Sequence, residues 1–365
     1  MKSEWDKGMK LTWGDIISLE YGKPVPDKFQ TNGDVPVFGT NGQIGTSNLP
    51  PLCSHASTIV GRKGAYRGVH YSNVPFSVID TAFFVEETTK LTDSKWVYYK
   101  LLTLDINRMD SGSAIPSTDR SEIYSLPVTV PPLPTQRKIA SILSALDDRI
   151  EINNAICRNL EKLLLTVYRN VKCASECVVK ELNSLAEFSN RKRLISRLNY
   201  QTYFSTENML PGKEGAIAAA SLPTTPKVTA CNPGDILVSN IRPYFKKIVY
   251  CSNKCGCSSD VLCFHPKEDI YATWLFCSLY EDDFFDYVTA GSKGTKMPRG
   301  DKAHIMRYGI AVPTRKKLEE FKATGDLVLS QINCLRSENE RLNKLREVIL
   351  PKLMNGKLDI ENIKA

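Results

Sequence analysis

A long amphipathic helix is predicted in the middle of the chain, after a proline-rich entry. The segment from Pro131 to Asn170 reads PPLPTQRKIASILSALDDRIEINNAICRNLEKLLLTVYRN. Pro134 suits a first helical turn, where the N–H that proline lacks would have no partner. Residues 134–170 as an α-helix would form a rod of roughly 55 Å, at about 1.5 Å per residue. One face carries apolar or small residues at alternating steps of four and three, the pattern of a coiled-coil seam: Ile139, Leu143, Leu146, Ile150, Cys157, Leu160, Leu164 and Val167, with Asn153 in the remaining seam position.

The same seam returns 182 residues later, at the C-terminal end of the chain. Pro351 and the pair Asn355-Gly356 are signals for the end of this second helix. Three of its seam positions hold Gly325, Asn339 and Arg346. The apolar seam residues are Phe321, Val328, Ile332, Leu335, Leu342 and Ile349.

The offset of 182 also holds before the two helices, which predicts an internal repeat. It aligns Pro116 with Pro298, Asp119 with Asp301, Ile123 with Ile305, and Val130-Pro131 with Val312-Pro313. Upstream, each half is rich in β-forming residues punctuated by glycine and proline. Each half also contains an apolar strand, a turn with Arg and Lys, and a second strand, at 57–71 and at 234–250.

We therefore predict an α+β fold in which two β-rich domains alternate with two long helices. The predicted boundaries are 1–133 for the first domain, 134–170 for the central helix, 171–313 for the second domain, and 314–365 for the C-terminal helix and tail. The helices are expected to pair antiparallel as a coiled-coil spacer and to relate the two halves by a pseudo-two-fold axis. The alternative is that each helix packs on its own domain; the narrow seam favours helix-on-helix packing.

A buried seam asparagine tends to fix the register of a helix pair. Placing Asn153 opposite Asn339 gives contacting residues whose numbers add up to 492. The expected layers are then Ile150 with Leu342, Cys157 with Leu335, and Leu160 with Ile332.

Composition is that of a globular protein, with 42% hydrophobic and 24% charged residues in 365. The formal net charge of +8 is compatible with a polyanionic partner and equally with a solvated surface. The N-terminal sequence is too polar for a signal peptide, and no apolar run reaches the ~18 residues of a membrane span. We therefore expect a cytoplasmic protein that does not associate with membranes.

No stretch of the sequence predicts an active site. GTNGQIGTS at 39–47 lacks the Gly-Lys-Ser/Thr end of a phosphate loop and is more consistent with turns. CNPGD at 231–235 is interpreted as a turn that opens a strand, and EDDFFD at 281–286 as a half-buried helix face. The four histidines show no ligand spacing. The eleven cysteines lack paired zinc knuckles, so no metal is expected, although metal binding by the group Cys231, Cys251, Cys255 and Cys257 stays open.

Taken together, these segments resemble the specificity subunit of type I restriction–modification systems. The resemblance rests on the Pro-Leu-Pro-x-Gln-Arg entry at 132–137, on GDILVSNIRPY at 234–244, and on LPKLMNGKLDI at 350–360. It extends over essentially the whole chain. The second helix departs from the pattern, because VPTRKKLEEF lacks the Pro-Leu-Pro-x-Gln-Arg start, which leaves the first residue of that helix open.

The resemblance implies two target recognition domains, each reading one half of a split sequence in double-stranded DNA, with the helix pair setting the distance between them. It implies no catalytic activity in this chain. Two methyltransferase subunits would bring S-adenosylmethionine, and restriction subunits that use ATP and Mg²⁺ would join through them. A rod of roughly 55 Å can hold two domains at the ~34–36 Å that separates half-sites read from one face of DNA.

Side chains that contact DNA are expected on the turns between strands, because base readout needs Arg, Lys, Asn or Gln on reaching loops. In the first domain the candidates are Arg62, Lys63 and Arg67. In the second domain they are Asn240, Arg242, Tyr244, Lys246 and Lys247, with Arg191, Lys192 and Arg193 as phosphate contacts. The alternative is that these are solvated turn residues.

Two other functions remain alternatives at this point. The chain could serve another DNA-directed defence complex or be a silent copy of a recombining locus. It could also be a stand-alone nuclease, which would need clustered acids near a lysine to hold Mg²⁺.

Overall fold

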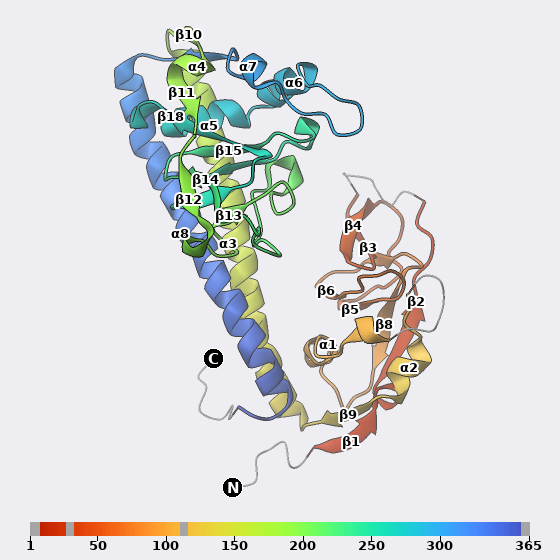
Figure 1. Ribbon diagram of the computed structural model, residues 1–365. Coiled ribbons are helices and arrows are strands. Elements are labelled where there is room, and N and C mark those ends of the chain that lie inside the picture. Colours follow the sequence, from red (N-terminus) through yellow and green to blue (C-terminus); the bar gives the residue numbers. More distant parts are fainter. Residues whose placement is uncertain (1–7, 27–32, 110–115, 359–365) are drawn as a thin grey trace. The chain divides into compact units, whose positions relative to one another are not determined.

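Figure 1 shows the computed structural model, which describes residues 8–26, 33–109 and 116–358. The chain divides into two compact units, one formed by residues 1–152 and 339–365 and the other by residues 153–338. Helix α3 (Leu133–Ala174) and helix α8 (Arg315–Met354) each contribute to both units. Helices and sheets are mixed throughout, as expected for the α+β class.

The first unit is built on a four-stranded antiparallel sheet with the strand order β2-β8-β5-β6. Strands β4, β3 and β7 form a second sheet, in which β3 and β7 are parallel, and β1 pairs with β9. The stretch at 39–47, predicted to form turns, contains the β3–β4 turn at 40–41 and then strand β4, where Gly42 has φ +110°. The strands are β1 (Met9–Thr12), β2 (Ile17–Tyr21), β3 (Val35–Gly39), β4 (Gly42–Ser47), β5 (Ser57–Gly61), β6 (Val69–Ser72), β7 (Ser77–Val78), β8 (Ala82–Thr88) and β9 (Pro127–Val130).

The second unit repeats this strand order in its own four-stranded antiparallel sheet, β11-β18-β15-β16. A second sheet, β12-β14-β17-β13, again contains one parallel pair, β13 with β17, and β10 pairs with β19. The strands are β10 (Val178–Glu181), β11 (Ala186–Phe188), β12 (Lys192–Leu194), β13 (Tyr203–Phe204), β14 (Lys227–Cys231), β15 (Ile236–Ser239), β16 (Ile248–Tyr250), β17 (Cys255–Cys257), β18 (Val261–Pro266) and β19 (Gly309–Val312).

Short helices follow the main sheet in both units, α1 and α2 in the first and α5, α6 and α7 in the second, whereas α4 precedes the sheet of the second unit. Trp96 on α1 and Trp274 on α5 are fully buried, and Asp119 and Asp301 cap α2 and α7 with their carboxylates. Phe284 and Phe285 on α6 are buried, which confirms EDDFFD as a half-buried helix face. The helices are α1 (Ser94–Leu101), α2 (Arg120–Ser125), α4 (Leu182–Leu185), α5 (Ala272–Tyr280), α6 (Asp282–Ala290) and α7 (Lys302–Ile305).

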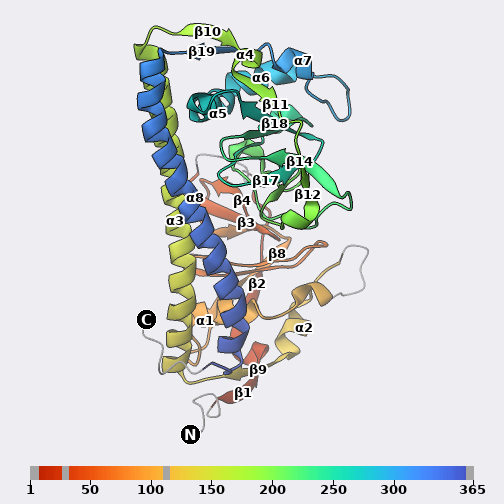
Figure 2. The ribbon, with the colours of Figure 1, turned by 60° about the vertical axis from the view of Figure 1, so that its left-hand side comes forward.

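Within the second unit, α3 and α8 lie side by side and run in opposite directions (Figures 1 and 2). The β10–β19 pair joins the end of α3 to the start of α8. The Tyr168 and Phe321 rings lie 6.2 Å apart, and the Cys157 thiol donates to the Ile332 carbonyl at 3.9 Å. The cluster that contains these residues also contains Trp274, so the helices pack both on each other and on the domain.

Contacts between the two helices do not single out one register. The residue numbers add up to 489 for Tyr168 with Phe321 and for Cys157 with Ile332, and to 497 for Glu161 with Arg336. The expected sum of 492 lies between these values and stays a prediction. Gly325 allows a close approach here, since a Cβ at this position would lie 2.5 Å from Thr273 of α5 and 3.3 Å from Leu164.

In the first unit, Arg346 of α8 forms an ion pair of 2.7 Å with Asp147 of α3, which also accepts a hydrogen bond from Tyr99 of α1. The first helix begins at Leu133 and so includes Pro134 in its first turn, as predicted. Pro351 does not end α8, which continues to Met354. The end lies at Asn355-Gly356, where Gly356 has φ +64° and donates its N–H to Leu353.

Candidate nucleic-acid interface

The hairpin between β5 and β6 is the part of the first unit that carries the predicted DNA contacts. Its turn, residues 62–68, is held by the segment that precedes α2. Gly64 donates its N–H to the Pro116 carbonyl at 2.9 Å, and Thr118 donates to the Arg62 carbonyl at 2.8 Å. Lys63 and Ser117 form an isolated antiparallel bridge between these two bonds. We call this turn tip 1.

The hairpin between β15 and β16 is held in the same way in the second unit. Arg242 donates its N–H to the Pro298 carbonyl at 2.8 Å, Gly300 donates to the Asn240 carbonyl at 3.2 Å, and Ile241 bridges Arg299. Each of these residues lies 178 or 182 positions after its counterpart in the first unit. We call residues 240–247 tip 2.

The predicted residues of tip 1 are largely engaged in contacts within the chain. The Arg62 guanidinium lies over the Tyr21 ring at 4.8 Å, and the Lys63 ammonium lies 3.6 Å from the Asp80 carboxylate. Arg67 is only 3% exposed and donates to the Asn107 carbonyl at 2.9 Å. The expectation that Arg67 faces DNA is therefore not supported by its position, because its side chain ties the hairpin to the chain around Asn107.

Tip 2 presents more of its side chains. Tyr244 is 49% exposed, with its ring centroid 4.8 Å from that of Phe245. Arg242 is half-buried, and Asn240 is 8% exposed with its side-chain oxygen lacking a partner in the described part of the chain. Arg242 and Lys246 both have left-handed backbone conformations, with φ of 50° and 52°, which residues with a Cβ rarely adopt.

The two lysines of tip 2 have partners in the free protein. Lys246 contacts the Asp282 carboxylate at 2.6 Å, and Lys213 contacts the same oxygen at 2.9 Å. Hydrogen bonds from Lys246 and then Lys213 lower the pKa of Asp282 to about 2. Lys247 donates to the Thr206 carbonyl at 2.5 Å, and desolvation lowers the pKa of this lysine. To contact a DNA phosphate, the Lys246 ammonium must leave or share the Asp282 carboxylate, and the Lys247 ammonium must leave or share the Thr206 carbonyl.

A cationic cavity lies beside β12 in the second unit. Its volume is about 470 Å³, and Lys192, Arg193, Leu194, Arg197 and Lys227 line it. Among the described residues, no carboxylate forms an ion pair with these four cations or with the exposed Arg191. Arg193 is half-buried and donates to Asn232 at 3.2 Å. Arg191 and Lys192 are thus exposed as phosphate contacts require, whereas Arg193 also has a structural contact.

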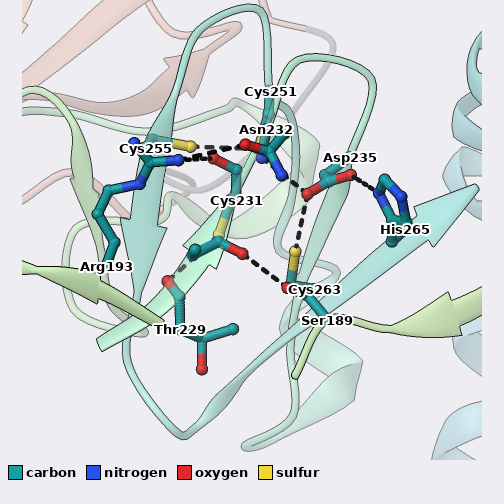
Figure 3. Close-up of polar contacts among 11 residues, drawn as sticks. Ser189, Arg193, Thr229, Cys231, Asn232, Asp235, Cys251, Cys255, Cys263 and His265 are labelled. Atoms are coloured by element: carbon teal, nitrogen blue, oxygen red, sulfur yellow. Dashed lines mark hydrogen bonds and ion pairs between the residues drawn. The ribbon is translucent and has the colours of Figure 1, made fainter. Parts of the chain in front are cut away.

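Asp235 organises the base of tip 2 (Figure 3). Its carboxylate is buried and accepts hydrogen bonds from the Asn232 N–H at 2.8 Å and the Cys263 thiol at 3.4 Å, and it lies 2.6 Å from His265 Nδ1. Gly234 has φ +89°. CNPGD is therefore a turn that opens β15, as predicted, and its aspartate anchors the strand that leads into the tip.

The cysteines near this turn form a buried thiol cluster. The Cys255 and Cys251 sulfurs are 3.4 Å apart, and Cys231 lies opposite Cys255 across strands β14 and β17. Hydrogen bonding by Cys231 and Cys251 lowers the pKa of the Cys255 thiol. Within residues 8–26, 33–109 and 116–358, no group of three or more His, Cys, Asp or Glu residues is arranged to hold a metal ion. Over the same residues, no helix is both long and apolar enough to span a bilayer.

Ten of the predicted seam positions, taken from both helices, are buried or half-buried. Leu146, Ile150, Leu160 and Leu342 are half-buried. The buried ones are Ile139, Leu143, Asn153, Ile332, Leu335 and Asn339. Ile139 and Leu143 pack in the core of the first unit with Trp96, Leu353 and Met354. The layer that would pair Asn153 with Asn339 stays a prediction.

Sequence reasoning missed several side chains at these sites. Tyr66, in tip 1, is 79% exposed, and Phe245, in tip 2, is 39% exposed. Lys227 joins the cavity beside β12 through strand pairing, because Leu194 and Lys227 are register partners, and Arg197 joins it from the 3-10 turn that follows β12. The offset of 178 between the two tips could have found Tyr66, since it aligns this residue with Tyr244.

The known proteins with similar sequences or folds described below are specificity subunits of type I restriction–modification systems. The profile of the type I restriction modification DNA specificity domain matches residues 5–162. The chain is 22% identical over 397 residues to the type I restriction enzyme EcoDI specificity subunit of Escherichia coli, covering 94% of this chain and 87% of that one. It is 23% identical over 322 residues to the MjaVIII specificity subunit of Methanocaldococcus jannaschii, covering 76% and 73%. The crystal structure of the type I restriction–modification S subunit from M. genitalium superposes with a TM-score of 0.62 at 16% identity, over 95% of this chain and 96% of that one.

Proposed function

The chain belongs to the specificity subunits of type I restriction–modification systems, and we propose that it reads a bipartite DNA target, with each unit recognising one half. DNA sequence recognition is the function that the sequence and fold comparisons favour over a stand-alone nuclease or another defence complex. As a member of this family, the chain has a non-catalytic role.

The main support for recognition of a DNA target in two halves is that both units contain an equivalent hairpin. The same three backbone contacts hold tip 1 and tip 2, at Pro116–Thr118 and at Pro298–Gly300. Two copies of one scaffold with different side chains at the tips can read two different sequences. The equal strand orders β2-β8-β5-β6 and β11-β18-β15-β16 support the same view.

Phosphate contacts are proposed at the cavity beside β12. Unpaired cations such as Lys192, Arg197 and Lys227 repel one another, and a polyanion relieves this repulsion. Contacts to DNA phosphates position a protein without reading sequence, whereas contacts to base edges specify it. We therefore assign the cavity to positioning and the tips to reading.

Helices α3 and α8 are proposed to act as the spacer between the half-sites and as the platform for partner subunits. Ile156 and Leu163 of α3 are exposed and seven residues apart, so they share one helix face. An apolar helix face of this kind suits a partner helix. The partners are proposed to be methyltransferase subunits, two per chain, together with restriction subunits, and S-adenosylmethionine, ATP and Mg²⁺ would bind to those subunits.

Sequencing the methylome of a host that expresses the chain with its methyltransferase subunits tests this function. We expect methylation at one motif made of two defined halves separated by unspecified bases. The purified chain alone, given S-adenosylmethionine, should not methylate DNA. A contiguous motif, or methyl transfer by the chain alone, would contradict the proposal.

A further inference from the structure

We infer that Tyr66 and Tyr244 are the side chains with which the two tips stack against DNA bases, one in each half-site. This inference rests on the proposed function and goes further by naming the contact. Both residues are tyrosines at equivalent positions of the two hairpins, 178 residues apart.

The hydrogen bonds that hold the backbone near the two tyrosines are equivalent as well. In each tip the tyrosine lies two residues after one with positive φ, Gly64 at +121° and Arg242 at +50°. In each tip that residue donates its N–H to a proline carbonyl, Pro116 or Pro298. The two tyrosines therefore lie at the same distance from equivalent backbone anchors, although only tip 2 forms a 3-10 turn, at Pro243–Phe245.

Neither tyrosine has a structural role that would explain an aromatic residue. Tyr66 is 79% exposed and Tyr244 is 49% exposed. Within the described residues, neither hydroxyl has a hydrogen-bond partner, and only Tyr244 has a ring contact, with Phe245. Tyrosine is enriched at interfaces because its ring is apolar and its hydroxyl is polar, so exposed tyrosines at the same point of both units suit contact with a ligand.

Tip 2 holds its aromatic pair in a strained and well-anchored turn. Left-handed Arg242 and Lys246 flank Pro243, Tyr244 and Phe245. The Lys246 carbonyl accepts from the Lys213 N–H at 2.9 Å, so the turn is fixed from outside the hairpin as well. Strain at residues with a Cβ persists where the surroundings enforce it and concentrates at functional sites. A fixed turn loses little conformational freedom when it binds.

The chemistry of the tips suits nucleic acid. Arg62 and Lys63 precede Tyr66, and Lys246 and Lys247 follow Tyr244. Lys63 and Lys246 are paired with Asp80 and Asp282 in the free protein and would exchange these partners for phosphates. Every base has a π-face on which an aromatic ring can stack. Proteins that kink DNA insert large side chains between base steps next to cationic phosphate contacts.

Photo-crosslinking in the assembled complex tests the contact directly. The chain with its methyltransferase subunits is bound to its own site, in which 5-iodouracil or 5-iodocytosine replaces each pyrimidine in turn. On excitation, these bases react preferentially with aromatic side chains that stack on them. We expect peptides that contain Tyr244 to crosslink in one half-site and peptides that contain Tyr66 in the other.

Substitutions provide the second measurement. Tyr66→Ala and Tyr244→Ala should each weaken binding to the cognate duplex by about 5- to 150-fold. Tyr244→Phe, which keeps the ring, should recover most of the loss. Tyr200→Ala is the matched control, because Tyr200 is exposed in the second unit but lies outside the tips. All four changes are at exposed positions, so the unfolding midpoints should stay constant.

The outcomes separate this inference from the function on which it rests. Cognate binding with crosslinks only at other residues, or with unchanged affinity of both alanine variants, overturns the stacking contact and leaves the proposed function intact. A wild-type complex that binds no sequence specifically overturns the proposed function and the stacking contact together.

Discussion

Tip 1 and tip 2 are held by the same backbone hydrogen bonds but carry different side chains. In tip 1, glycine adopts the positive φ at position 64, and Arg67 is buried against Asn107. In tip 2, Arg242 adopts positive φ, and Phe245, the counterpart of Arg67, is exposed. The hydrogen bonds that hold the turn are therefore the same in the two units, while the exposed side chains differ. Substitutions in the exposed side chains of such a turn can change the DNA sequence that it recognises while the fold stays the same.

The largest difference between the two tips is expected from the residues that open their strands. Asp235 opens β15 with a buried carboxylate, whereas Ser57, 178 residues earlier, opens β5 with a hydroxyl that donates to the Val85 carbonyl. Asp235→Ala leaves His265, Cys263 and the Asn232 N–H without their acceptor, so we expect a loss of about 3 kcal/mol or more in unfolding free energy. Ser57→Ala should lose about 1 kcal/mol. Denaturant unfolding measures both, and equal losses would show that Asp235 does not organise tip 2.

Charge reversal at tip 2 should affect DNA binding more than charge reversal on the helix. Arg242→Glu should weaken cognate binding by about 30-fold or more, since a good contact to a base is worth roughly 1–3 kcal/mol and the new carboxylate is repelled by phosphate. Lys162→Glu, on the exposed face of α3, should change it far less. Both affinities are measured at one fixed salt concentration. Similar losses for both variants would count against the assignment of tip 2.

Substitution of Arg67 tests whether this residue stabilises the first unit rather than contacting DNA. Arg67→Ala should destabilise the first unit by about 2 kcal/mol, because it removes buried packing and the hydrogen bond to Asn107. The salt dependence of DNA binding by the folded complex should not change, since a residue that touches no phosphate releases no counterion. A salt slope reduced by about one unit would show instead that Arg67 reaches DNA.

The smallest effects are expected from exchanging the residues with positive φ. Arg242→Gly should stabilise the free protein by up to about 1 kcal/mol, because glycine adopts the left-handed conformation without strain. Gly64→Ala should destabilise it by about 1–2 kcal/mol, since φ +121° suits only glycine well. Thermal unfolding of the two variants checks the signs. Destabilisation by Arg242→Gly would mean that the arginine side chain contributes more than its backbone strain removes.

The sequence predicts much of this architecture because its signals are local and repeated. The seam spacing located both long helices, and the 182 offset located the segments that hold the tips. The strand–turn–strand patterns at 57–71 and 234–250 correspond to β5–β6 and β15–β16. These features depend on residues close together in the chain, which a pattern can report.

The parts that were not predicted depend on packing between distant segments. The burial of Arg67 requires the chain around Asn107, 40 residues away. The close packing of α8 on α5 at Gly325 involves Thr273, which the heptad pattern does not contain. The cavity beside β12 needs the pairing of Leu194 with Lys227. Pro351 was interpreted as an end signal, but a proline in the last turn is tolerated within α8.

The two units are proposed to read separate halves of one DNA target. The most direct test replaces residues 178–312, from the start of β10 to the end of β19, with the equivalent segment of a specificity subunit of known and different target. The methylome of a host carrying this chimera with its methyltransferase is then sequenced. We predict a motif in which one half is replaced by that of the donor while the other half and the spacing are retained. A fully methylating chimera whose motif is unchanged, or changed in both halves, would contradict the claim.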